Sequence, residues 1–564
     1  MLPGDRLTTK RTRTMRFPLR LSVATLFVIA CTSSERGDAP EGDIGGALTI
    51  ALPAEPSTLM PPLVRYTHEK QIVDQVFDAL AEIGPSLNTL GDADWTPRLA
   101  DSWQWAADSM SITFKLNPRA RWHDGQRVSA HDVRFTLDLI KDPRVGARAV
   151  ASVADVDSVS VPDSTTAVVW YARRSPEQFY NFAYNVVPVP EHLLRNADRA
   201  NLASDPQGRS PVGSGPFKFV RWEPRTLIEV AADTNHALGR PKLDRVIWML
   251  NPEVTAALVT VLAGDIDVLE TVSPDGMTRI AAQSEVLAIP YTNPNYGYMG
   301  FNLRDQRNPE RPHPLFGDRG LRRALAMAID RRTLLKNVYD TLAWLGVGPV
   351  SRMLATADTS AAMVPFDSIG ADRLLDSLGW RDQDGDGVRE KGGRPLRFGL
   401  MAPASSAGRR RYAELIQAQL KSHGVQVDVD LGDMAVVGPR MFSSKFDAFL
   451  MNWGSEPSPT SIRDQWHTLP VKQRASNLQL YGNPVVDAAI DSAMTEPDAA
   501  RSRAHYRKAY QGIIDDVAAV WLYENRSFMA MNRRVHPSTR VSDAWWRHLR
   551  LWSIPAADRL PRHG

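Results

Sequence analysis

Strand-like and helix-like segments alternate along this chain, and this alternation restricts its fold more than any other feature. The strand-like segments are short runs rich in β-branched and aromatic residues, and they cover residues 46–53, 111–116, 166–171, 244–250 and 425–431. The helix-like segments carry an apolar stripe at helical spacing, and they cover residues 321–339, 408–424 and 503–523. Because helices and strands follow one another in this way, we predict a mixed α/β fold.

Turn and capping residues indicate where some of these elements end. Gly424 is suited to terminate the helix that begins near residue 408, and Asp330 is suited to cap a second helical segment within residues 321–339. The sequence "LAGDIDV" (262–268) reads as a helix ended by Gly264 and followed by a strand. The sequence "GSGPF" (213–217) reads as a glycine-rich bend before another strand.

The chain has 564 residues and one cysteine, so no internal disulfide is available. A chain of this length can bury several hydrophobic cores and needs no disulfide, and it corresponds to three or four domains or to one large composite. Hydrophobic residues make up 43% and charged residues 23%, which is the balance of an ordinary globular protein.

The cysteine ends a segment with the build of a secretory signal. Arg16 and Arg20 precede an apolar run over residues 21–30, which is too short to span a bilayer, and Cys31 follows at once. The end of the run, "VIAC", resembles the lipobox of bacterial lipoproteins, so we predict a signal peptide over residues 1–30 and lipidation of Cys31. An ordinary signal peptide with a chance cysteine is the alternative, and Met15 is a possible true start. Residues 31–45 are small and polar and predict a flexible linker.

Removal of the signal peptide changes the charge of the protein. Residues 1–30 carry six Lys or Arg and one Asp, so the net charge falls from +3 to −2 without them. The basic character of the whole chain therefore does not indicate nucleic-acid binding. No later stretch is apolar enough to predict a membrane span.

Eight further segments together resemble one family, the family 5 extracellular solute-binding proteins, which are peptide- and nickel-binding receptors of ABC importers. They occur in the order of that family within residues 46–530: "WTPRLADSWQW" (95–105), "SITFKLNPRARWHDGQRVSAHDVRFTL" (111–137), "PVGSGPFKFVRWEP" (211–224), "GRPKLDRVIW" (239–248), "LVTVLAGDIDV" (258–268), "YGYMGFNLR" (296–304), "RRALAMAIDRRTLL" (322–335) and "GWRDQDGDGVREKGGRPLRF" (379–398). Each segment alone is weak evidence, because most of them specify turns and caps, but the ordered set is specific.

The resemblance implies an α/β fold of the periplasmic-binding-protein type, with two lobes that close on a cleft by a hinge and with one inserted domain. Lobe I would comprise residues 46–88, 206–288 and 506–564, the inserted domain residues 89–205, and lobe II residues 289–505. The implied function is that of a monomeric, lipid-anchored extracytoplasmic receptor, facing the periplasm in a Gram-negative cell, which delivers a peptide or peptide-like solute to an ABC permease. The alternative ligands are a nickel or other metal chelate, haem or a sugar.

The resemblance also suggests ligand-binding residues. In peptide-binding relatives an aspartate shortly after a "GW" segment pairs with the free α-amino group of the ligand, and the matching position here carries Glu456, three residues after Trp453. A second acidic position common in those relatives carries Ser458 instead. A carboxylate is a suitable partner for a buried ammonium, and Trp453 could flank the ligand. Glu456 could equally be a solvated loop acid, and Trp453 a core residue.

Three further residues are weaker candidates for contact with the ligand. Tyr298 and Asn302 lie where the family crosses into the second lobe, and Tyr66 lies near the opening turn of the first lobe. No cofactor and no metal ligand are predicted.

The sequence offers little support for an enzyme, so a hydrolase is the least favoured alternative. Once Cys31 is acylated, no thiol remains for catalysis or for a cysteine-ligated metal. The sequence "HEKQI" (68–72) lacks the second histidine of a zinc-binding helix, and Val212 replaces the first glycine of a nucleophile elbow in "VGSGP". The chain has no phosphate-binding loop of the Walker type, and its histidines are dispersed.

The acidic sequence "DQDGDGVREKGG" (382–393) has the first half of an EF-hand calcium loop. Its twelfth position is Gly393, so the bidentate glutamate that completes such a site is absent, and a strand rather than a helix is expected to follow. We therefore predict aspartate- and glycine-based turns that need no ion.

Overall fold

The computed structural model describes residues 44–454, 456–468, 470, 476–539 and 544–560, which belong to one compact unit. The expected signal peptide, Cys31 and all but the end of the expected linker lie outside these residues. Among the described residues, no helix is both long enough and apolar enough to cross a membrane.

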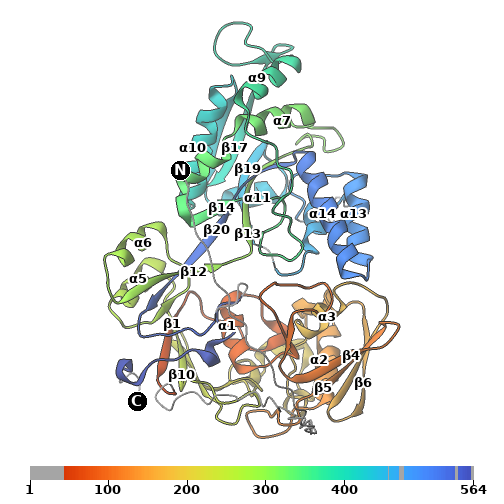
Figure 1. Ribbon diagram of the computed structural model, residues 1–564, viewed down its shortest axis with the longest axis vertical. Helices are drawn as coiled ribbons and strands as arrows, with labels where there is room; N and C mark the ends of the chain where they lie inside the picture. The colour runs from red at the N-terminus through yellow and green to blue at the C-terminus, as the bar shows by residue number, and fades with distance from the viewer. Residues whose placement is uncertain (1–43, 455, 469, 471–475, 540–543, 561–564) are drawn as a thin grey trace, which may run out of the picture. The chain divides into compact units, whose positions relative to one another are not determined.

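A sheet of twelve strands holds most of this unit together (Figure 1). Ten strands follow the order β18-β17-β19-β13-β20-β11-β1-β10-β9-β8, while β12 and β14 also pair with β20. The strands of this sheet are β1 (Ala47–Leu52), β8 (Phe217–Glu223), β9 (Leu227–Ala232), β10 (Arg245–Leu250), β11 (Val268–Leu269), β12 (Val286–Thr292), β13 (Asn295–Phe301), β14 (Ala343–Leu345), β17 (Arg397–Pro403), β18 (Gln426–Gly432), β19 (Ala448–Gly454) and β20 (Ala519–Asn532).

The long strand β20 connects the two halves of this sheet. Its first residues, Ala519 to Tyr523, pair with β13, and its last residues, Arg526 to Asn532, pair with β12. In Figure 1 it is the blue strand that runs from the neighbourhood of β13 to that of β12. The backbone of one continuous strand therefore links the residues expected in lobe I to those expected in lobe II.

A separate four-stranded sheet lies entirely within residues 89–205, the expected inserted domain. Its order is β4-β5-β7-β6, and all its neighbours are antiparallel. Its strands are β4 (Ala100–Trp105), β5 (Ser111–Leu116), β6 (Val156–Asp163) and β7 (Thr166–Tyr171). Two small two-stranded sheets pair β2 (Ala81–Ile83) with β3 (Trp95–Pro97) and β15 (Glu390–Lys391) with β16 (Arg394–Pro395).

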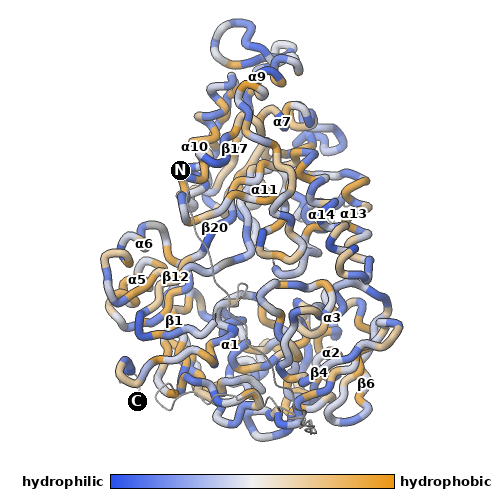
Figure 2. The backbone as a smooth tube through the Cα atoms, in the orientation of Figure 1, coloured by the Kyte–Doolittle hydropathy of each residue, from blue (hydrophilic) through white to orange (hydrophobic). Residues whose placement is uncertain are grey.

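Helices surround these sheets, and several of them are amphipathic. Along α10, α13 and α14 the colour in Figure 2 alternates between blue and orange, as expected for helices with one buried face. The helices are α1 (Thr67–Val76), α2 (Ala130–Lys141), α3 (Gln178–Ala183), α4 (Glu191–Leu194), α5 (Val254–Leu262), α6 (Pro274–Ala281), α7 (Arg319–Ala328), α8 (Arg331–Val338), α9 (Ser368–Ser377), α10 (Ala407–Lys421), α11 (Met434–Phe442), α12 (Ser461–Trp466), α13 (Pro484–Thr495) and α14 (Ala499–Asp515).

The five predicted strands are present as β1, β5, β7, β10 and β18, with ends that differ by at most one residue. The helix predicted over residues 408–424 is α10, and Gly424 has the expected positive φ after it. The segment 321–339 forms two helices, and the Asp330 carboxylate caps the second by accepting from the N–H groups of Arg332 and Thr333.

The prediction of a helix over residues 503–523 is wrong beyond residue 515. Helix α14 ends at Asp515, and the chain enters β20 at Ala519. The sequence "AAVWLY" (518–523) is apolar throughout, so its periodicity fits a buried strand as well as a buried helix. Pairing with β13 decides for the strand.

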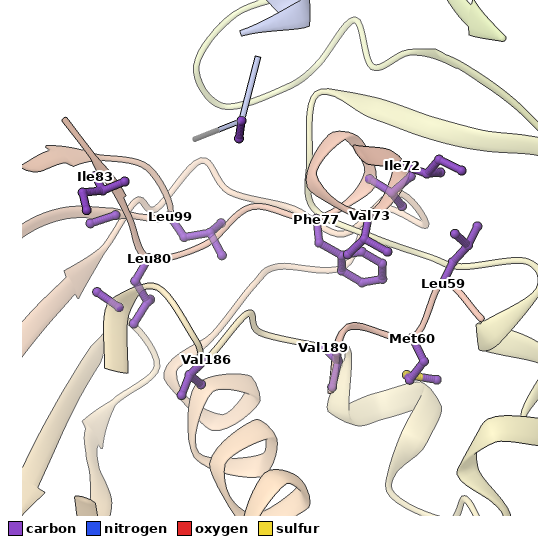
Figure 3. Close-up of a cluster of buried hydrophobic side chains, with 14 of the residues drawn as sticks. Leu59, Met60, Ile72, Val73, Phe77, Leu80, Ile83, Leu99, Val186 and Val189 are labelled. Carbon is purple, nitrogen blue, oxygen red and sulfur yellow. The ribbon is translucent and has the colours of Figure 1, made fainter. Parts of the chain in front are cut away.

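A hydrophobic cluster fixes α1 in place. Residues of α1 also line a cavity, which is described below. Ile72, Val73 and Phe77 from α1 and its end are buried beside Leu59 and Met60 (Figure 3). Burial of each large apolar side chain contributes about 1.5–3 kcal/mol.

The segment that carries Gly213 and Gly215 crosses the end of α1. A Cβ atom on Gly213 would lie 1.8 Å from the carbonyl oxygen of Val76, so a side chain cannot be accommodated there. The predicted glycine-rich bend is thus required by the close approach of two backbones.

Two expected domain boundaries fall inside secondary structure. The boundary at residues 288 and 289 lies within β12, and the boundary at residues 505 and 506 lies within α14. Helix α14 contributes Tyr506 and Tyr510 to the same buried cluster as Tyr298 and Trp466 of the expected lobe II. The division into lobes stays a prediction, and α14 shares this cluster with residues of the expected lobe II.

Candidate functional site

A cavity of about 510 Å³ collects residues from distant parts of the chain. Its walls come from the segment 53–74, from the segment 148–187, from the residues after β11 and at the end of β12, from Glu456 and Pro457, and from Trp545 and Trp546. Residues of all three expected domains therefore meet at this cavity. Its volume lies in the range of about 300–1,000 Å³ that is usual for small-molecule sites.

Glu69 organises the first turn of α1 at the edge of the cavity. Its carboxylate accepts from the N–H groups of Ser57, Arg65 and Tyr66 and from the Ser57 hydroxyl, over 2.7–3.1 Å. Burial opposes ionisation of Glu69, but these hydrogen bonds outweigh it and hold the pKa of Glu69 below its ordinary value. The chain before α1 is thereby fixed so that Arg65, Tyr66 and His68 line the cavity.

An ion pair on α1 forms part of the cavity wall. Lys70 Nζ lies 2.7 Å from Asp74 Oδ1, and the Trp546 indole N–H donates to Asp74 Oδ2 over 2.9 Å. Burial lowers the pKa of Lys70, but the Asp74 charge, the hydrogen bond to Asp74 and the nearby Tyr184 together outweigh burial and leave this pKa above its ordinary value. The charge of Asp74 is therefore compensated within the protein.

Glu270, which follows β11 directly, is a second carboxylate in the wall. Gln71 Nε2 of α1 donates to Glu270 Oε2 over 2.6 Å. Burial raises the pKa of Glu270 above its ordinary value, and burial together with the Glu270 charge raises the pKa of the neighbouring Tyr291 to about 12. Glu270 thus lies in a poorly hydrated part of the cavity.

The exposed rim of the cavity is formed by Tyr66, Arg148 and Glu456. The guanidinium of Arg148 forms an ion pair with Glu456, and its Nη1 also donates to the carbonyl oxygen of Arg65 over 3.1 Å. The Tyr66 ring is 60% exposed and stacks on His68, with 5.5 Å between ring centroids. The Arg148–Glu456 pair joins the segment 148–187 to the loop after β19.

Two of the five expected ligand residues, Glu456 and Tyr66, line this cavity. Tyr298 is 2% exposed and packs against Trp466 and Trp521 in the core, while Asn302 is fully buried and donates to the carbonyl oxygens of Ser444 and Phe446. Trp453 is half-buried in β19 at the edge of the same core. The ligand roles of these three residues stay predictions, but their side chains are not part of the cavity wall.

The sequence reasoning missed Lys70, Asp74, Arg148, Glu270 and Trp546, which all line the cavity. One signal was available for Lys70 and Asp74, because opposite charges four residues apart on a helix face form a pair. For Glu270, Arg148 and Trp546 the sequence holds no comparable local signal.

The acidic loop 382–393 folds through the predicted aspartate turns. The Asp382 carboxylate accepts from the N–H groups of Gly385 and Gly387, and the Asp386 carboxylate accepts from the N–H of Val388. The structure also brings one carboxylate oxygen from each of Asp382, Asp384, Asp386 and Glu390 within 4.8 Å of one another. Glu390 stands at the ninth position of the loop, whereas the sequence argument against calcium considered only the missing glutamate at the twelfth position. The prediction that this loop needs no ion therefore stays a prediction.

Comparisons with known proteins agree with this architecture. The family model described as bacterial extracellular solute-binding proteins, family 5 Middle, matches residues 94–468. The oligopeptide-binding protein AppA of Bacillus subtilis (strain 168) is 26% identical over 548 residues, which cover 93% of this chain and 97% of AppA.

Solved structures show the same fold. AppA from Bacillus subtilis in complex with a nonapeptide has a TM-score of 0.69 at 24% identity and covers 91% of this chain and 99% of its own. NikZ from Campylobacter jejuni in complex with Ni(L-His) has a TM-score of 0.72 at 22% identity and covers 91% of this chain and 100% of its own. These likenesses confirm the predicted fold class.

Proposed function

This chain belongs to the bacterial extracellular solute-binding proteins of family 5, and from this premise we propose that it binds a peptide or peptide-like solute in the 510 Å³ cavity. In this proposal the protein is a receptor and not an enzyme. It is exported, held outside the cytoplasm by a lipid on Cys31, and passes its ligand as a monomer to the permease of an ABC importer.

The observation that carries the peptide proposal is the mixed charge of the cavity wall. The wall contains cationic and anionic side chains together: Arg65, Lys70, Arg148, Asp74, Glu270 and Glu456. A short peptide carries an ammonium, a carboxylate and polar amides, which match such a wall. The rings of Tyr180, Tyr184 and Tyr291 offer surface for apolar side chains of the ligand.

The parts of the proposal that concern export and transport have a different basis. The lipid anchor is supported by the "VIAC" sequence that ends at Cys31. Delivery to an importer is supported by family membership and by AppA, which is named an oligopeptide-binding protein.

A metal chelate is the second candidate ligand, because NikZ binds Ni(L-His) on the same fold. Among the described residues that line the cavity, His68 is the single histidine. A bare nickel ion prefers several imidazole ligands, so the cavity suits a chelate that brings its own ligands better than the free ion.

Native mass spectrometry of the purified mature protein tests the proposal. Because binding proteins of this kind hold their ligand between domains, we expect the protein to retain a mixture of short peptides, which denaturation releases. Isothermal titration of the emptied protein with di- and tripeptides should then show binding at one site. Retention of a single metal complex or a sugar, with no peptide binding, would overturn the peptide proposal.

A further inference from the structure

Three of the four carboxylates that belong to the cavity wall or to its α1 edge already have compensating partners. Asp74 is paired with Lys70, and Glu456 is paired with Arg148. Glu69 is stabilised as a carboxylate by hydrogen bonds from the backbone N–H groups of the chain before α1. A cationic ligand would have to displace these partners, or compete with them, in order to bind there.

Glu270 differs from these carboxylates. Its hydrogen-bond partners are the Gln71 amide, which donates to Oε2 over 2.6 Å, and the Trp545 indole. Both partners are neutral, and no Lys, Arg or His among the described residues forms an ion pair with Glu270. A carboxylate accepts up to about four hydrogen bonds, so part of its capacity remains for a ligand. A buried carboxylate without a cation is costly, and the raised pKa of Glu270 reflects that cost.

The surroundings of Glu270 hold it rigidly toward the cavity. Leu269, the preceding residue, pairs with Ala530 of β20, and Val268 pairs with Ile50 of β1. Gln71 is 1% exposed on α1, so the donor to Glu270 is also fixed. A fixed carboxylate loses little conformational entropy when a ligand arrives, which favours affinity.

The walls beside Glu270 suit a cation as well. The aromatic residues Tyr291 and Trp545 line the same cavity, and the charge of Glu270 acts on the Tyr291 hydroxyl. Aromatic rings stabilise ammonium and guanidinium groups through their π-faces by about 0.5–2 kcal/mol. Desolvated pairing with a carboxylate adds charge-assisted hydrogen bonds.

We propose that Glu270 is the residue that binds the cationic group of the ligand, an ammonium at the end of the peptide or on one of its side chains. The inference rests on the proposed peptide-binding function. It assigns to Glu270 the role that the family resemblance suggests for Glu456, whose charge Arg148 compensates at the rim.

The test combines a substitution in the protein with a modification of the peptide. Wild type, Glu270→Gln and Glu456→Gln are titrated with Ala-Ala-Ala, with N-acetyl-Ala-Ala-Ala and with N-acetyl-Lys-Ala-Ala. Glutamine retains an oxygen that accepts from Gln71, so the fold should persist, and circular dichroism checks it. Glu310→Gln, which neutralises an exposed carboxylate, is the matched control.

We expect acetylation of Ala-Ala-Ala to weaken binding to wild type by 10-fold or more, and to change binding to Glu270→Gln by less than 3-fold. Glu456→Gln and Glu310→Gln should retain the wild-type dependence on acetylation. If N-acetyl-Lys-Ala-Ala regains affinity for wild type but not for Glu270→Gln, the cation that Glu270 binds is on a side chain. If this peptide does not regain affinity, that cation is the α-ammonium.

Two results would overturn the inference. The first leaves the proposed peptide-binding function intact, and the second overturns that function as well. If wild type binds the peptides and Glu270→Gln retains the full dependence on acetylation, the role of Glu270 is wrong and the peptide-binding function stands. If wild type binds none of the three peptides, the proposed function itself fails and this inference fails with it.

Discussion

At the scale of single residues, the carboxylates around the cavity differ in the side chains that pair with them. Asp74 has a lysine one turn away on the same helix, whereas Glu456 and Glu270 have partners 308 and 199 residues away in the sequence. All three residues carry a carboxylate. Their surroundings decide whether the charge is compensated within the protein, as in Asp74 and Glu456, or is available to a ligand, as in Glu270. The role of Glu456 as a ligand partner stays a prediction; the structure places Glu456 in the cavity wall and pairs it with Arg148, which the sequence did not indicate.

The Arg148–Glu456 pair should contribute little to stability. The side chains of Arg148 and Glu456 are 61% and 63% exposed, and exposed ion pairs are worth about 0–1 kcal/mol because water screens them. A double-mutant cycle with Arg148→Ala, Glu456→Ala and both together, measured by urea unfolding, should give a coupling free energy below about 1 kcal/mol. A coupling above about 2 kcal/mol would show that the pair is part of a buried network.

Glu69 should contribute much more, because its partners are backbone groups at the start of α1. Glu69→Ala leaves the N–H groups of Ser57, Arg65 and Tyr66 without their acceptor. We expect a loss of about 2–4 kcal/mol in the free energy of unfolding, since hydrogen bonds to a charged group are the strong ones. Glu69→Gln retains part of the acceptor capacity and should lose less; equal losses for the two variants would contradict the hydrogen-bond explanation.

At the scale of elements, the local patterns located the five predicted strands and the helices within residues 321–339, 408–424 and 503–523, but not where α14 ends. The predicted strands were confirmed because alternation and β-branched residues select an extended backbone, and Asp330 caps α8 because its side chain reaches the next N–H groups. The apolar sequence that follows α14 has no such period, so the partner strand β13 decides its structure. Turn residues such as Gly264 and Asp382 were predicted for the same local reason.

The contact of the 213–217 bend with α1 gives a prediction at this scale. In Gly213→Ala the added Cβ atom would clash with the carbonyl oxygen of Val76, so we expect a loss of about 3 kcal/mol or more, or failure to fold. Gly239→Ala is the control, because Gly239 has a φ of +96° but no atom within 4 Å of an added Cβ. It should lose only about 1 kcal/mol from backbone strain, as measured by thermal unfolding. Similar losses in the two variants would contradict the steric explanation.

At the scale of the whole molecule, contacts between distant segments join the expected domains. Strand β20 pairs with strands of both expected lobes. Glu177, within the expected inserted domain, accepts from Thr89 Oγ1 over 2.6 Å and from Ser458 Oγ of the expected lobe II over 2.9 Å. The charge of Glu177 also contributes to raising the pKa values of Tyr506 and Tyr510 of α14. A carboxyl group is thus buried where the segment 89–205 meets lobe II.

This buried carboxyl group predicts a pH dependence of stability. Burial raises the pKa of Glu177 from 4.5 to about 7, against the opposing hydrogen bonds from Thr89 and Ser458. The folded protein therefore holds a proton that the unfolded chain releases, so the contribution is fully present below pH about 4.5 and is lost as pH rises through about 7. The change amounts to roughly 3 kcal/mol.

Urea unfolding of wild type and Glu177→Gln between pH 5 and pH 8 measures this effect. Glutamine stays neutral at every pH, so the free energy of unfolding of Glu177→Gln relative to wild type should increase as pH rises. Glu310→Gln should show the wild-type profile. A constant difference between wild type and Glu177→Gln over this range would show that Glu177 does not titrate there.

The sequence by itself determined the predicted strands, most of the predicted helices, the turns and the family, because periodicity, capping residues and the order of motifs are properties of neighbouring residues. Through the resemblance it predicted five ligand contacts, which are Glu456, Trp453, Tyr298, Asn302 and Tyr66, and only Glu456 and Tyr66 line the cavity. Only the tertiary structure decided which polar side chains meet: Gln71 reaches Glu270 across 199 residues, and Arg148 reaches Glu456 across 308. The physical reason is that desolvation and ion pairing depend on what the folded chain packs against each side chain, and no local pattern encodes those partners.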